Sequence, residues 1–110
     1  MSDQLSGFFV TTGPDGSRPG ASVVAVHGDV DMATAPALRA RVTEALSGRP
    51  QVLLFDLAAM TFMDCSGVGV IAYARNRLSG DCQVILRCPT RLVRQVLELT
   101  GMDGPCVIED

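Results

Sequence analysis

The stretch "VLLFDLAAMTFMDCSGVGVIAYARNRL", residues 52–78, joins two apolar runs through a polar break, Asp64-Cys65-Ser66-Gly67. Residues 51–56 are almost continuously apolar, which is typical of a strand buried on both faces of a sheet. Residues 66–79 carry apolar side chains at helical spacing, and Gly80 is placed to end that helix. This stretch therefore predicts a buried strand, a polar turn and a helix.

Two details of this stretch lead to further expectations. Asp56 follows the apolar run, and we interpret it as a turn residue. Residues 61–63 are expected to form a short extended segment that leads into the polar break. The strand predicted at residues 51–56 would then end before Leu57.

The rest of the chain repeats this alternation of short strands and helices. Strands are expected at residues 8–12, 22–27, 82–87 and 105–108, and helices at residues 34–47 and 89–100. Residues 13–22 predict a loop, Gly28 ends the second strand, and Thr34 is a candidate helix cap. Strands that alternate with helices indicate an α/β fold with a mostly parallel sheet, whose first strand pairs antiparallel at an edge.

Length and charge limit the classes of function. A chain of 110 residues fits one domain, 1–110, in which we expect residues 1–7 to be flexible. The net charge is −3 and lysine is absent, which argues against nucleic-acid binding and against a P-loop enzyme. We see no signal peptide and no membrane-spanning run, so a cytoplasmic protein without a membrane partner is expected.

Four cysteines, at positions 65, 82, 88 and 106, show no C-x-x-C spacing, and His27 is the single histidine. This supply of ligands predicts no metal site and no cofactor. We expect free and mostly buried thiols in a reducing compartment, Cys65 included.

The polar break at residues 64–67 has several interpretations. The simplest is a helix cap by Asp64 or Ser66. Alternatively, a phosphate on Ser66 would be stabilised by the backbone N–H groups of the helix start, and Gly67 would leave space for the backbone of a partner. Cys65 as a nucleophile would need a base, and a serine hydrolase would need a G-x-S-x-G motif that is absent.

A second polar group, Gly28-Asp29-Val30-Asp31, lies between a strand and a helix. Asp29 and Asp31 are either turn and first-turn acids or a pair of carboxylates able to bind Mg²⁺, with Asp64 as a third acid from a neighbouring strand end. The residues alone leave both interpretations open.

Two separate stretches resemble one family. "VVAVHGDVDMATAPALRARV", residues 23–42, is similar to the first strand, the G-[DE]-φ-D turn and the helix start of STAS domains, where φ is an apolar residue. Residues 52–78 resemble their φ-φ-φ-D-L block and the D-S-S-G motif that follows it, with Cys65 at a position where a small residue often stands. The resemblance runs from about residue 8 to residue 108 and identifies the chain as similar to bacterial anti-sigma factor antagonists.

The resemblance implies a STAS fold, with a four- to five-stranded, mixed but mostly parallel sheet and helices packed mainly on one side. It implies a regulatory protein and not an enzyme, which binds an anti-sigma factor with Ser/Thr kinase activity. Ser66 is implied as the phosphorylated residue, supported by Asp64 and Asp31, and a phosphatase would restore the binding form. We expect Gly67, Asp29 and Thr34 to belong to the same partner-binding region.

Alternative functions within this resemblance remain open. The chain would otherwise be a STAS module of a stress-signalling complex that senses a ligand or nucleotide, or a thiol enzyme that uses Cys65. The sequence also leaves open whether Cys65 provides a redox input and whether the chain is a monomer or a weak dimer.

Overall fold

The computed structural model describes residues 7–110, so the expected flexibility of residues 1–7 falls almost wholly outside the described part. One sheet in the order β1-β2-β3-β4-β5 and three helices make up the fold. The strands are β1 (Phe9–Pro14), β2 (Ala21–Val30), β3 (Val52–Met63), β4 (Gln83–Arg87) and β5 (Val107–Glu109), and the helices are α1 (Ala35–Ser47), α2 (Cys65–Arg77) and α3 (Arg91–Leu99). Strand β1 pairs antiparallel with β2 and every other pair is parallel, which confirms the predicted mixed, mostly parallel sheet.

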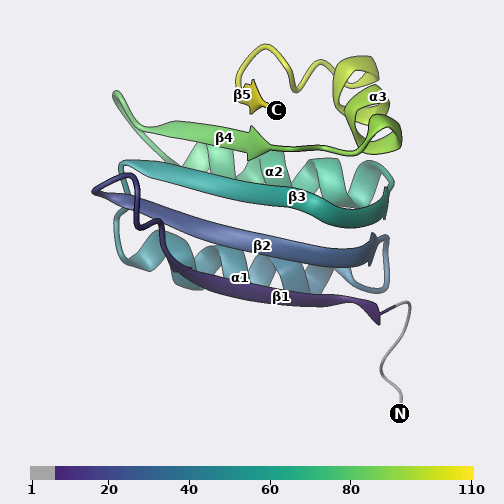
Figure 1. Cartoon of the computed structure of the whole chain (residues 1–110), viewed down its shortest axis with the longest axis horizontal. Helices are drawn as coiled ribbons and strands as arrows, with labels where there is room; N and C mark the ends of the chain where they lie inside the picture. Colours follow the sequence, from purple (N-terminus) through teal and green to yellow (C-terminus); the bar gives the residue numbers. More distant parts are fainter. Residues whose placement is uncertain (1–6) are drawn as a thin grey trace.

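The helices are distributed unevenly over the sheet. Helices α1 and α2 lie side by side on one face, and α3 lies beyond the end of β4, where it contacts β3 (Figure 1). The core forms between this helical layer and the sheet. It includes Val24, Val26, Val30, Leu38, Val42, Leu53, Phe55, Val70, Ile71, Ala74 and Leu86. The predicted STAS arrangement, with helices mainly on one side, is therefore confirmed.

Strand β2 extends past the point where the sequence predicted its end. Gly28 adopts a positive φ of 88°, which glycine tolerates without strain, so the chain stays paired with β3 instead of turning away. Asp29 and Val30 pair with Phe62 and Met63 of β3. The expectation that Asp29 lies in a turn after the strand is therefore wrong.

Strand β3 is a single strand of 12 residues, where the sequence suggested one strand and a separate short segment. Asp56 lies inside it, opposite Ala25, and its carboxylate accepts a hydrogen bond from the backbone N–H of Ala58 at 3.1 Å. Between Asp56 and Ala59 the strand has one residue more than β2, which is a β-bulge. Asp56 bonds to a nearby backbone N–H as a turn residue does, but this bond lies at the bulge inside β3 and not in the predicted turn.

The loop between β1 and β2 is shorter than the predicted 13–22, because residues 13, 14, 21 and 22 belong to the strands. Its side chains reach across the sheet: Arg18 pairs with Glu109 at 2.6 Å and Asp15 with Arg87 at 3.6 Å. The hydrogen bond from Arg18 lowers the pKa of Glu109. These pairs attach the first hairpin to the strands at the opposite edge.

Five of the six helix ends differ from the sequence prediction by one or two residues. Helix α2 ends at Arg77 with Leu78 as its C-cap, so Gly80 lies in the following turn, with a φ of 63°. Helix α3 begins only at Arg91, because the Thr90 hydroxyl caps it by accepting from the Val93 N–H at 3.3 Å. Leu92, in the first turn of α3, is half exposed, whereas Val93 and Leu97 are buried.

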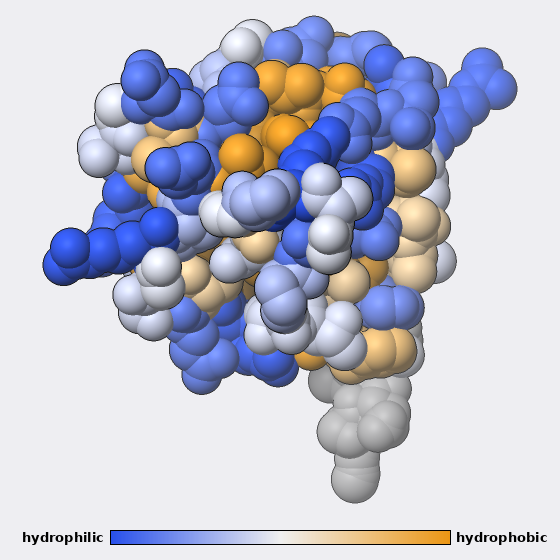
Figure 2. Space-filling model, turned by 60° about the vertical axis from the view of Figure 1, so that its left-hand side comes forward, coloured by the Kyte–Doolittle hydropathy of each residue, from blue (hydrophilic) through white to orange (hydrophobic). Residues whose placement is uncertain are grey.

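With the amino-terminal ends of strands β2 to β4 turned forward, the surface is mostly hydrophilic; the most strongly hydrophobic atoms lie near the top of the view, and paler ones follow its right side (Figure 2). No helix among residues 7–110 has the length and apolar content needed to cross a membrane.

Candidate functional site

The turn between β2 and α1 is held together by its own side chains. The Asp31 carboxylate accepts hydrogen bonds from the backbone N–H groups of Ala33 at 2.9 Å and Thr34 at 3.2 Å. The Thr34 hydroxyl accepts from the Asp31 N–H at 3.0 Å and donates to the Asp29 carbonyl at 2.9 Å. Thr34 stands at the N-cap position, but its side chain makes no capping hydrogen bond, so the predicted Thr34 cap is wrong. The Asp31 carboxylate is the side chain that accepts from the backbone N–H groups of this turn.

The turn between β3 and α2 is capped by Asp64, in agreement with the simplest interpretation of the polar break. Its carboxylate accepts a hydrogen bond from the Ser66 N–H at 2.8 Å, and its carbonyl accepts from the Gly67 N–H at 3.1 Å. The Asp64 N–H donates to the carbonyl of Val30 at 3.2 Å. This last bond ties the start of α2 to the end of β2, next to the first turn.

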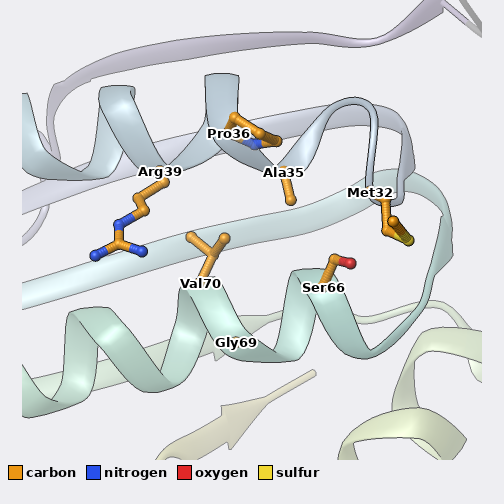
Figure 3. A pocket seen from close by; sticks show the side chains of 7 residues that line it. All are labelled: Met32, Ala35, Pro36, Arg39, Ser66, Gly69 and Val70. Carbon is orange, nitrogen blue, oxygen red and sulfur yellow. The ribbon is translucent and has the colours of Figure 1, made fainter.

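Ser66 lies half-buried in the first turn of α2. Within residues 7–110 its hydroxyl has no hydrogen-bond partner. The side chain lines a pocket of about 450 Å³ between α1 and α2, and its oxygen points toward Met32 (Figure 3). The pocket is lined by Met32, Ala35, Pro36, Arg39, Ser66, Gly69 and Val70.

Of the seven residues that line this pocket, sequence reasoning placed only Ser66 in the candidate site, and the residues it missed include Met32, Arg39 and Gly69. Met32 is 80% exposed at the tip of the β2–α1 turn, and Gly69 is exposed with nothing within 4 Å of where a Cβ would stand. An apolar Met32 directly after an acid in a turn was the available signal. The role of Gly69 depended on how α2 faces α1, which the sequence does not specify.

Gly67 has a role different from the predicted clearance for a partner, because it is buried. A Cβ at this position would lie 2.4 Å from the Met63 Cγ and 3.0 Å from the Val30 Cγ1. Glycine is thus required for α2 to pack against the ends of β2 and β3. The partner-clearance interpretation of Gly67 is wrong, and Gly69 is the glycine that faces outward.

Asp29 lies apart from Ser66. Its neighbour Val30 contacts α2, so the alternation of a strand points Asp29 toward the other face of the sheet, where its carboxylate accepts from the Thr61 hydroxyl. Among residues 7–110 no three acidic, histidine or cysteine side chains are grouped to hold a metal ion. The strand ends therefore bring the backbones of the two turns together without forming a carboxylate cluster.

Cys65 is exposed, which corrects the expectation of a buried thiol. The core-facing residues of α2 are Gly67, Val70, Ile71 and Ala74, and Cys65 falls on the opposite side of the helix. Of the other thiols, Cys106 is buried, and this burial raises its pKa to about 11. His27 stacks on Phe9 with ring centroids 4.0 Å apart, on the sheet face away from α2, so it supplies no base to Cys65.

The groove between α1 and α2 continues past the pocket toward a tyrosine. The Arg39 guanidinium lies over the Tyr73 ring, 4.1 Å from its centroid, and the Tyr73 hydroxyl is hydrogen-bonded to Thr43 at 2.9 Å. Arg77 lies on the same ring at 5.6 Å. The surface between α1 and α2 therefore has two parts. At the pocket, Ser66 lies beside the exposed apolar side chain of Met32, and around Tyr73 the surface is cationic and aromatic.

Comparison with known proteins identifies close structural likenesses. The STAS domain family model matches residues 16–106. The anti-sigma-F factor antagonist RsfB of Mycobacterium tuberculosis is 25% identical over 84 residues, which cover 76% of this chain and 69% of that protein. The crystal structure of an anti-sigma factor antagonist from Mycobacterium paratuberculosis has a TM-score of 0.84 at 26% identity and covers 93% of this chain and 85% of that one.

A further solved structure shares the fold at lower identity. It is the phosphorylated form of SpoIIAA, described as a Bacillus cell fate determinant, with a TM-score of 0.66 and 21% identity over 94% of this chain and 91% of that one. The residues matched by the family model include both strand-to-helix turns, 31–34 and 64–67.

Proposed function

This chain belongs to the STAS domain family, and we propose that it acts as an anti-sigma factor antagonist. In this role it binds an anti-sigma factor that is also a Ser/Thr kinase, and a sigma factor is thereby set free. Phosphorylation of Ser66 ends the binding, and a phosphatase restores it. The names of the relatives support the general role, and the Ser66 site supports the switch.

The observation that carries the proposal is the Ser66 hydroxyl, which faces a pocket and makes no hydrogen bond within the described residues. A kinase must align a serine oxygen with the γ-phosphorus of ATP. The oxygen then loses its proton and bonds to phosphorus, and ADP leaves. A hydroxyl already engaged in the fold, such as that of Thr34, is unsuited to this reaction.

The partner surface is formed by Met32, Gly69 and the pocket between α1 and α2. Met32 offers an apolar side chain that is 80% exposed, and Gly69 allows close backbone approach. Interfaces of this kind bury about 800 Å² on each partner, so the pocket is the centre of a larger contact. Asp31 and Thr34 support this surface by holding the turn that presents Met32.

Phosphorylation would disturb this surface without refolding the protein. A phosphate on Ser66 adds about −1.5 to −2 charges two residues from the Asp64 carboxylate. It also fills part of the pocket that the partner would occupy. Charge and bulk together lower the affinity of a partner that fits the unmodified pocket.

The direct test is intact mass spectrometry of the chain after incubation with ATP and a candidate anti-sigma factor kinase. Wild type gains the mass of one phosphoryl group, and Ser66→Ala gains none. A phosphorylated Ser66→Ala variant would show that another residue is the acceptor. Thr34 serves as an internal control, since peptide mapping is expected to find it unmodified.

Binding measurements test the partner surface. Met32→Gln is expected to weaken binding to the same kinase by about tenfold or more, as for a central interface residue. The matched control is Leu99→Gln on α3, which also removes an exposed apolar side chain (87% exposed) but contributes nothing to the lining of the pocket. Equal binding of Ser66→Glu and wild type would contradict the phosphate switch.

A further inference from the structure

The pocket that Ser66 faces contains one charged side chain, Arg39. Its guanidinium rests on the exposed face of Tyr73 and forms no ion pair with an acid among residues 7–110. The neighbouring Arg41 differs, because it pairs with Glu44 and donates to the Val10 carbonyl at 3.0 Å. Arg39 is therefore the cation of this surface that is free to take a new anionic partner.

The positions of the two residues allow them to meet. Ala35 and Arg39 line the pocket one helical turn apart on α1, and Ser66 and Val70 do so on α2 (Figure 3). A turn rises about 5.4 Å and the axes of packed helices lie about 8–10 Å apart, so a stagger of one to one and a half turns separates Arg39 from Ser66 by about 10–13 Å. An extended arginine and a phosphorylated serine together bridge this distance by rotation of side chains alone.

We propose that Arg39 is the intramolecular receptor for the phosphate group on Ser66, and that their pairing closes the pocket to the partner. This inference rests on the proposed function, since it presumes that Ser66 is phosphorylated. The planar guanidinium donates paired hydrogen bonds that match two phosphate oxygens, and such charge-assisted bonds are stronger than an exposed contact with an aromatic ring. Arg39 therefore leaves Tyr73 when the phosphate is added.

The pairing changes the surface in a defined way. In the unmodified chain the Arg39 side chain lies along the groove toward Tyr73, and the space between Met32, Pro36 and Ser66 is open. In the phosphorylated chain the guanidinium crosses above Val70 and covers that space. The ion pair between Arg39 and the phosphate on Ser66 then covers the apolar pocket to which the partner binds in the unmodified chain.

The test uses the full chain with phosphoserine incorporated at position 66 during translation, so that no kinase is needed. The second pKa of phosphoserine, about 6 in a free peptide, is measured by ³¹P NMR titration. A nearby cation favours the dianion, so this pKa is expected to be lower in wild type than in Arg39→Gln by about 0.5 to 1 unit. Arg39→Gln is expected to fold normally, because the side chain is exposed.

The matched control is Arg77→Gln, which removes the other guanidinium near Tyr73 but none from the pocket. Its phosphoserine pKa is expected to equal that of wild type. A second measurement follows the side-chain protons of Arg39, which the Tyr73 ring shields in the unmodified chain. They are expected to move downfield when Ser66 carries the phosphate.

An identical phosphoserine pKa in wild type and Arg39→Gln would overturn the pairing, as would an equal shift in Arg77→Gln or unmoved Arg39 resonances. These failures are distinct from failure of the proposed function. If no kinase modifies Ser66 but the NMR shifts are present, the kinase switch is wrong and the pairing stands. If the kinase modifies Ser66 and the shifts are absent, only the role of Arg39 is wrong.

Discussion

The two strand-to-helix turns of this protein, residues 31–34 and 64–67, begin alike and end differently. In each, an aspartate accepts a hydrogen bond from the backbone N–H two residues ahead, Asp31 from Ala33 and Asp64 from Ser66. In the first turn the hydroxyl of Thr34 is buried and bonded on both sides. In the second, the Ser66 hydroxyl faces a pocket.

The same capping chemistry can therefore make a hydroxyl structural or leave it available. The Thr34 hydroxyl reaches back to the end of β2, where it donates a hydrogen bond to the Asp29 carbonyl at 2.9 Å. Gly67 lets α2 pack closely on Met63 and Val30, and the adjacent Ser66 consequently faces the pocket. Packing beneath the helix, and not the cap, separates the two roles.

The largest effect on this contrast is expected from Gly67→Ala. The added Cβ would overlap the Met63 Cγ, so we expect the free energy of unfolding to fall by about 2–3 kcal/mol. Urea unfolding of Gly69→Ala is the matched control, because that Cβ meets nothing and alanine is the better helix former by about 0.5 to 1 kcal/mol. Equal stability of the two variants would refute the close packing of Gly67.

Thr34→Val is expected to lower the free energy of unfolding by about 2 kcal/mol. The change keeps the shape of the side chain but leaves the Asp31 N–H and the Asp29 carbonyl without their buried partner. Thr34→Ser keeps the hydroxyl and should lose clearly less stability in the same urea titration. If Val and Ser were equally tolerated, the Thr34 hydrogen bonds would contribute little.

Loss of either capping carboxylate is expected to have a smaller effect. Asp64→Ala removes one acceptor and should destabilise the protein by about 1 kcal/mol. Asp31→Ala removes an acceptor for two N–H groups and should cost about 1.5 kcal/mol by thermal or urea unfolding. A larger loss of stability for Asp64→Ala than for Asp31→Ala would contradict this order. It would indicate that the Asp64 cap contributes more than its single hydrogen bond suggests.

Ser66→Ala is expected to change the free energy of unfolding by no more than about 0.5 kcal/mol. The hydroxyl makes no hydrogen bond within residues 7–110, so its removal breaks none there. The comparison with Thr34→Val, measured under the same conditions, isolates the difference between the turns. A loss comparable to that of Thr34→Val would mean that the Ser66 hydroxyl is structural.

Particular residues show why some features were predictable from the sequence. Apolar residues at strand and helix spacing located the central strands and helices, because side-chain period follows directly from backbone geometry. The Asp64 cap was predictable because the N–H group that donates to its carboxylate lies only two residues along the chain, at Ser66. Ser66 was singled out by the resemblance of two separate motifs.

Other expectations failed where the outcome depended on distant partners. Gly28 and Asp56 were expected to end strands, but pairing between β2 and β3 absorbs both as irregularities of continuous strands. Cys65 and Gly67 were assigned to the wrong sides of α2, because the facing of a helix is set by the strands beneath it. Asp29 was grouped with Asp31 and Asp64, although strand alternation directs it to the opposite face.

The order of the elements, the mixed sheet and the helix start at Ser66 follow from the sequence alone, because they depend on local periodicity and local hydrogen bonds. Only the tertiary structure decided that α1 and α2 enclose a pocket at Ser66, with Met32 and Arg39 in its wall. Those residues lie 27 or more positions from Ser66 along the chain, and the parallel β2–β3 pairing brings their helices together. Such contacts between distant segments are set by packing, which no local pattern encodes.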